Sequence, residues 1–252
     1  MTRVLLLRGA LALVLGTMAP AVLAREPDEP IRLAWMEGDV AGMQPILSAD
    51  GTPIGFVEYY QRRRSDVLEA VRIARFSDGS SDEDRAEARV GNTLEALRGR
   101  SIIREASGTA VVDVEIDVVR DRVNGFYRED GKRHEVDLPP ATYWGPLVFV
   151  VVKNFAANAE DGRVEFRTVA LTPKPRVLGM ELVRGRADVV RRPGGEIDVI
   201  DYALRPTIHW LVDPIVHRIA PETHFLLHSG TPPALARYAG PRNYSGQAIR
   251  LE

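Results

Sequence analysis

Histidines are the residues whose spacing in this chain most resembles a metal site. On a regular helix, His209, Asp213 and His217 would lie four residues apart on one side, where imidazole and carboxylate groups could bind zinc. Pro214 interrupts that helix, and no H-E-x-x-H motif is present. A metal-dependent hydrolase using the His209–His228 region is therefore an alternative, while hydrogen-bonded or surface histidines that bind no metal are favoured. The histidines concerned are His209, His217, His224 and His228.

Two charged stretches could bind ions. Asp78, Ser80, Asp82 and Asp84 place oxygen atoms at alternate positions, but glycine follows the first aspartate directly and no glutamate closes a calcium loop. We therefore expect a solvated acidic turn over 77–84. The run 62–64 of three arginines could meet a phosphate, but it is more typical of a solvated strand end.

Motifs for covalent or cofactor chemistry are missing from the sequence. There is no cysteine, and no G-x-S-x-G, S-x-x-K, G-x-G-x-x-G or Walker pattern occurs. The sequence therefore assigns no catalytic residue, no metal ligand and no cofactor. A catalytic triad assembled from distant residues is not readable without the fold.

Aromatic and aliphatic residues gather in two segments, 143–155 and 207–219. Laid on a concave sheet, they would leave a cleft lined by aromatic rings, as in many small-molecule or lipid sites. The same side chains could instead simply fill the hollow of the sheet. If the cleft exists, the candidate ligand-binding residues are Tyr143, Trp144, Phe149, Phe155, His209 and Trp210.

Both apolar segments are predicted to be helical. For the first, prolines at 139 and 140 suit a helix start, and Asn154 and Asn158 suit its end, although 148–152 also has strand propensity. The second follows Pro206 and would be kinked at Pro214.

The elements that must position these segments are strands. Residues 55–63 and 67–76 resemble a hairpin, and 111–118 alternates strictly between apolar and acidic residues. The stretch 86–97 is ambiguous and is predicted as mixed strand and short helix. We predict a mainly β (α+β) fold, a curved antiparallel sheet or half-barrel with one to three short apolar helices against its concave face. Further strands are expected at 126–127, 134–138, 164–171, 176–183, 187–190, 197–204 and 247–251.

The first 24 residues are typical of a secretory signal peptide. Arg3 and Arg8 give a positive start, an apolar stretch follows, and 22–24 supplies a small-residue cleavage site. The apolar stretch is shorter than the ~20 residues of a spanning helix, so we expect no transmembrane anchor after cleavage. The expected organisation is a signal peptide over 1–24, an N-terminal extension over 25–53 and a single β-rich domain over 54–252 of a periplasmic or secreted protein.

Composition limits the class of partner. The chain has 252 residues, of which 45% are hydrophobic and 27% charged, as in a globular protein. Without the two arginines of residues 1–24, its 33 basic side chains become 31 against 35 acidic ones. This balance argues against nucleic acid as a partner.

Several loose motifs are spread over most of the mature chain: Phe76–Gly79, Leu138–Pro140, Tyr143–Gly145, Lys153–Asn154, Thr172–Arg176, Pro232–Ala234 and Arg237–Tyr238. With these motifs the chain resembles an uncharacterised family of bacterial exported β-sheet proteins. In outline this family is similar to the half-barrel lipoprotein carriers of the cell envelope, whose fold holds acyl chains. The resemblance implies export and a curved sheet, and it contributes no catalytic residue.

Three functions remain open at this point. The favoured one is a non-catalytic, exported periplasmic protein that binds or carries an apolar small molecule or lipid-like ligand. The first alternative is an envelope protein-interaction or assembly module that docks an unidentified partner through sheet edges or its proline-rich C-terminal segment. The second is the hydrolase considered above.

Overall fold

Strands dominate the computed structural model, which describes residues 28–35, 38–171, 174–192, 194–207, 222–242 and 247–251. They form one large, curved sheet that does not close on itself. This confirms the predicted mainly β, half-barrel-like fold with short helices. Neighbouring strands are antiparallel, except for the parallel pair β10 and β11.

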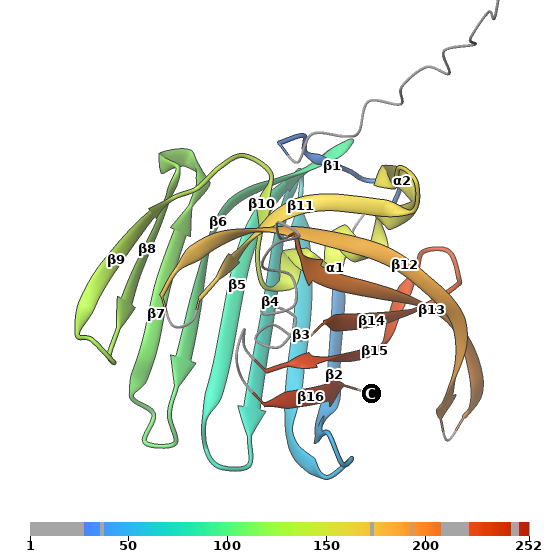
Figure 1. Cartoon of the computed structure of the whole chain (residues 1–252), viewed down its shortest axis with the longest axis horizontal. Helices are drawn as coiled ribbons and strands as arrows, with labels where there is room; N and C mark the ends of the chain where they lie inside the picture. Colours follow the sequence, from blue (N-terminus) through green and yellow to red (C-terminus); the bar gives the residue numbers. More distant parts are fainter. Residues whose placement is uncertain are drawn as a thin grey trace, which may run out of the picture.

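The sheet has two halves, which we call the first wall and the second wall. The first wall contains β2 (Val40–Ser48), β3 (Pro53–Arg64), β4 (Val67–Phe76), β5 (Ser81–Val90), β6 (Thr93–Arg104), β7 (Ala110–Asp117), β8 (Arg122–Tyr127) and β9 (Lys132–Asp137), with a 3-10 turn at Val118–Arg120. The second wall contains β10 (Thr142–Tyr143), β11 (Arg163–Ala170), β12 (Arg176–Arg192), β13 (Gly195–Pro206), β14 (Thr223–His228), β15 (Ala234–Pro241) and β16 (Ala248–Leu251). The walls join where β16 pairs with β2, and the second wall crosses in front of the first in Figure 1.

Two short helices lie between β10 and β11 in the chain, α1 (Pro146–Lys153) and α2 (Phe155–Asn158). The fixed backbone angle of Pro146 suits the first helical position, so the helix begins there rather than at the prolines of 139–140. It ends at Lys153 with Asn154 as its C-cap, as the sequence predicted. The predicted helix over 207–219 lies outside the described residues, apart from Thr207.

Small residues on the first wall make room for α1, which packs against β4 and β5. In a strand alternate side chains share a face, and the inward positions of these two strands include Ala70, Ala86 and Ala88. The main hydrophobic core then combines α1 with inward residues of both walls, such as Ile116 and Phe166. The helix is therefore held between the two walls.

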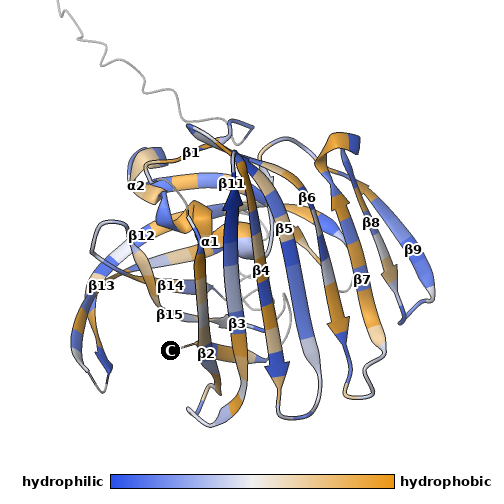
Figure 2. Ribbon diagram, turned by 180° about the vertical axis from the view of Figure 1, so that it is seen from behind, coloured by the Kyte–Doolittle hydropathy of each residue, from blue (hydrophilic) through white to orange (hydrophobic). Residues whose placement is uncertain are grey.

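The acidic stretch after Phe76 corrects the sequence prediction. The turn ends before Ser81, where β5 begins, so Asp82 and Asp84 are not part of a solvated turn. They point inward and are only 5% and 6% exposed. Over 86–97 the expected strand is present but the expected short helix is wrong, because these residues complete β5 and begin β6. On β5 the long charged side chains point outward and the short ones inward, and the strand is mostly blue in Figure 2.

The N-terminal residues are tied to the helices. Strand β1 (Ile31–Arg32) pairs with β6, and Asn158 exchanges hydrogen bonds with the backbone of Arg32 at 2.7 and 2.8 Å. The side-chain oxygen of Asn154 accepts a hydrogen bond from the Ala34 backbone amide at 2.8 Å. Segment 28–35 is thus fixed at one end of α1.

Candidate functional site

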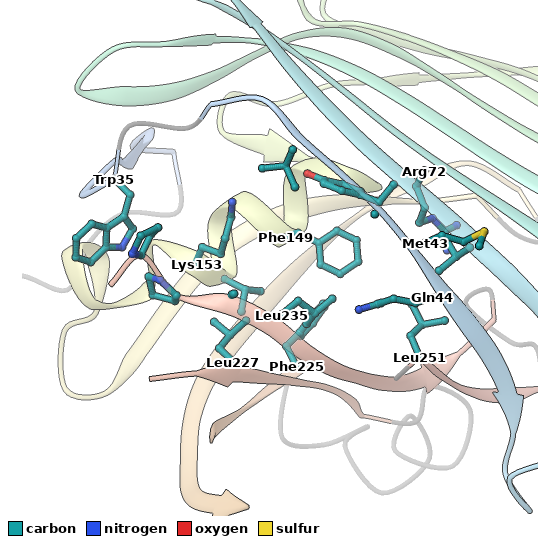
Figure 3. A pocket seen from close by; sticks show the side chains of 18 of the residues that line it. Trp35, Met43, Gln44, Arg72, Phe149, Lys153, Phe225, Leu227, Leu235 and Leu251 are labelled. Atoms are coloured by element: carbon teal, nitrogen blue, oxygen red, sulfur yellow. The ribbon is translucent and has the colours of Figure 1, made fainter. Parts of the chain in front are cut away.

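A pocket of about 450 Å³ opens between the two walls beside α1, and Figure 3 shows it from close by. This volume lies within the range of small-molecule sites. Most of its lining is apolar, and Gln44, Arg72 and Lys153 supply an amide and two cationic groups. The lining residues are Trp35, Gly38, Val40, Gly42, Met43, Gln44, Val57, Tyr59, Arg72, Phe149, Val152, Lys153, Phe225, Leu227, Pro232, Pro233, Ala234, Leu235 and Leu251.

Strand alternation explains why β2 and β3 leave this space. Gly42 faces Tyr59 across the two strands, and both residues line the pocket. A Cβ atom built on Gly42 would have no neighbour within 4 Å, so open space lies directly above its backbone. The missing side chain at position 42 therefore contributes directly to the size of the pocket.

Phe149 of α1 stands at the centre of the site (Figure 3). Its ring makes edge contacts with Tyr59 at 6.0 Å, Phe225 at 5.6 Å and Tyr238 at 6.4 Å between centroids. These partners come from β3, β14 and β15, so a single ring connects the two walls. Edge-to-face geometry is favourable for aromatic pairs and fixes the orientation of the ring.

A second cavity of about 230 Å³ also borders Phe149. Phe149, Arg72 and Phe225 line both spaces. The second cavity is also bordered by apolar residues of the second wall, including Met180 and Leu204, but it contains the two inward carboxylates of β5. The two spaces therefore share lining residues but differ in chemistry: the described charged groups of the first are cations, and the second also has two carboxylates.

Arg72 and Asp84 form a direct cross-strand pair between β4 and β5. Arg72 donates from Nε and Nη2 to Oδ2 of Asp84 at 2.9 and 2.5 Å, and Ser101 donates its hydroxyl to Oδ1 at 2.7 Å. Burial disfavours the charged guanidinium, but the nearby carboxylates of Asp84 and Asp82 outweigh it and raise the pKa of Arg72. Arg72 is thus a permanent cation with one side fixed by Asp84.

Arg242, which follows β15, ties the second wall to the first. It donates to both carboxylate oxygens of Asp82, at 3.0 and 2.9 Å, and to the hydroxyl of Ser80 at 3.1 Å. Its guanidinium also lies 3.6 Å from the centre of the Phe76 ring. A bidentate pair of this kind has a defined geometry, so it sets the spacing of the walls at the second cavity.

The predicted ligand-binding residues fall into three groups. Phe149 lines the pocket, whereas Tyr143, Trp144 and Phe155 are 1%, 1% and 4% exposed and lie in the core. His209 and Trp210 lie outside the described residues.

The three core aromatics are held by specific contacts. The Tyr143 hydroxyl donates to the Leu94 carbonyl at 2.9 Å and accepts from the Ile31 backbone amide at 3.0 Å. Trp144 covers Gly99, where an added Cβ would come within 2.4 Å of the indole nitrogen. Phe155 packs on Tyr202 at 4.9 Å. Their positions assign these rings to the sheet interior.

The described histidines of the C-terminal region lie away from the pocket. On β14, Phe225 and Leu227 line the pocket, so His224 and His228, at alternate positions, point to the opposite face. The Nδ1 atom of His224 lies 3.0 Å from Asp201. In the part of the chain that the structure describes, no group of three or more histidine, aspartate or glutamate side chains is placed to hold a metal ion.

Sequence reasoning missed much of the pocket lining. Trp35, Gly42, Tyr59 and Arg72 come from four separate segments of the chain, and no short motif joins them. The one available signal is strand alternation, which places Tyr59 and Val57 on one face of β3.

Comparison of the chain with protein-family models, curated proteins and solved structures found no match. None of the helices within the described ranges has the length and apolar character needed to cross a bilayer.

Proposed function

We propose that this protein binds an apolar or lipid-like small molecule without covalent chemistry, in the pocket between the walls. The observation that carries the proposal is the 450 Å³ space beside α1, whose lining is mainly aliphatic and aromatic. Burying apolar ligand surface there would contribute about 25 cal/mol per Å². We further propose that the protein is exported, on the basis of the signal-peptide pattern of residues 1–24.

The pocket can be blocked with little disturbance of the fold. Gly42→Phe adds a ring where the first added atom meets nothing within 4 Å, and the backbone there is extended. Ala41→Phe is the matched control, because position 41 is exposed and points to the opposite face of the same strand. Both variants should therefore fold, while only the first fills the pocket.

Binding can be measured with N-phenyl-1-naphthylamine, a neutral dye whose fluorescence rises in apolar surroundings. We expect the wild-type protein and Ala41→Phe to bind it equally, and Gly42→Phe to bind it at least about tenfold more weakly, a loss of about 1.4 kcal/mol. Native mass spectrometry of protein purified without detergent gives a second measurement. If no dye binds and no ligand is carried, or if both variants behave alike, the proposed function is wrong.

A further inference from the structure

The charged groups of the two cavities differ in how far they are already paired. Among the described lining residues, Asp82 and Asp84 are the carboxylates, and both border the second cavity. Asp82 pairs with Arg242, and Asp84 pairs with Arg72. Among its described lining residues, the apolar pocket holds the cations Arg72 and Lys153 and no carboxylate.

Arg72 lines both cavities and keeps donor capacity. A guanidinium has five N–H donors, and among the described residues the two bonds of Arg72, from Nε and Nη2, both go to Asp84. The Nη1 end remains for a ligand. In Figure 3, Arg72 and Trp35 lie on opposite sides of Phe149.

A buried ion pair needs a reason beyond stability. The side chains of Arg72 and Asp84 are 19% and 9% exposed, on an inward face where neighbouring positions hold alanine. Well-packed apolar residues often stabilise such a position at least as well as an ion pair. A pair that orients one arginine at the junction of two cavities is better explained by recognition of a ligand group.

We propose that the ligand is an amphiphile with a carboxylate head, which accepts hydrogen bonds from the free end of Arg72. Its apolar tail runs past Phe149 and Leu235 toward Trp35. This inference rests on the proposed function of the pocket. Because Asp84 already neutralises the charge of Arg72, the attraction between Arg72 and the carboxylate head comes from directed N–H donors rather than from net charge. Hydrogen bonds to an ionised acceptor are about twice as strong as neutral ones, so the acid is favoured over a neutral analogue.

The test compares hexadecanoic acid with hexadecan-1-ol, which share a chain length and differ in the head. The affinity of each compound is measured by its displacement of N-phenyl-1-naphthylamine from the wild-type protein, at neutral pH and below the concentration at which the compound aggregates. We expect the acid to bind about tenfold more tightly, the effect of one charge-assisted hydrogen bond. Equal affinities would overturn the inference and leave the proposed function standing. Failure of both compounds and of the dye to bind would overturn the proposed function as well.

Paired variants assign the preference to Arg72. The double variant Arg72→Gln with Asp84→Asn removes both charges together, so neither is left buried alone. It should bind the acid and the alcohol within about twofold of each other. The control is Arg242→Gln with Asp82→Asn, which removes an equivalent pair that lines the second cavity only. The control should keep the preference for the acid, and loss of the preference in both variants would contradict the assignment.

Discussion

The two sides of α1 have similar sequences and opposite surroundings. Leu147, Val150 and Val151 are 0% exposed and pack in the main core, whereas Phe149 faces the two cavities. The difference comes from the strands opposite rather than from the helix. On the first wall, the Trp144 ring fills the space over Gly99. The space over Gly42, which lines the same pocket as Phe149, stays open.

Removing the Trp144 ring, which precedes α1 and fills the space over Gly99, and removing the Phe149 ring of α1 should give the largest contrast. Trp144→Ala should lower the free energy of unfolding by about 3–5 kcal/mol, because it leaves a cavity in a fully packed region. Phe149→Ala should cost about 1–2 kcal/mol, because its ring already borders empty space. Urea unfolding followed by circular dichroism measures both values. Equal losses of unfolding free energy would show that the surroundings of Phe149 are as tightly packed as those of Trp144.

Asn154, at the C-terminal end of α1, connects the packed core side of the helix to the segment that borders the pocket. Its side chain is 0% exposed, accepts from the Ala34 amide and donates to the Val150 carbonyl at 2.9 Å. Asn154→Ala should lower stability by about 1–3 kcal/mol, since a buried amide loses its acceptor. It should also speed hydrogen exchange in 28–35. Asn124→Ala, on an exposed position of β8, is the control and should change neither quantity.

Two buried tyrosines, one in the core and one beside Phe149, should make the stability of the protein fall at alkaline pH. Burial raises the pKa of Tyr127 in the core of the first wall and of Tyr238 beside Phe149. Above the ordinary tyrosine pKa of about 10, the unfolded chain loses these protons while the native protein keeps them, so stability falls as the pH rises. Unfolding at pH 8 and pH 11, with phenolate absorbance as the titration signal, measures this loss.

Tyr127→Phe should reduce the alkaline loss without lowering stability at pH 8. Among the described residues the Tyr127 hydroxyl has no hydrogen-bond partner, so its removal relieves an unsatisfied buried group. A destabilised variant at pH 8 would contradict this account.

Some elements of this fold could be predicted from the sequence, and others could not. Strict alternation predicted β7, and the continuous apolar run with its closing asparagine predicted α1, because each signal is local and strong. Strand β5 was missed because its inward residues are two aspartates, two small alanines and a single valine, which together carry little hydrophobic signal. Their environment depends on Arg72 and Arg242, which lie 12 and 160 residues away from their partners.

The pocket illustrates the same limit. A uniformly apolar segment cannot indicate which of its side chains will face empty space, so Trp144, which precedes α1, and Phe149, within α1, were equivalent candidates. The space exists because a glycine on β2, a ring on β3 and the β14–β15 pair come together only in the folded sheet. Such a combination has no signature in a single sequence.

The smallest effect is expected on the outer face of the first wall, where ion pairs meet water. Arg100 makes two hydrogen bonds to Asp113, at 2.8 and 2.7 Å, and they lower the pKa of this carboxyl. The resulting stability is present above the unfolded pKa of about 4 and is lost as the pH falls through the lower folded value. Asp113→Asn should cost only about 0.2–1 kcal/mol at neutral pH, because the Arg100 side chain is 48% exposed and solvent screens the pair. The cost should shrink further in 1 M salt, where the Debye length is about 3 Å. A loss as large as that of Trp144→Ala would mean that the outer charges, and not the packing between the walls, hold the sheet together.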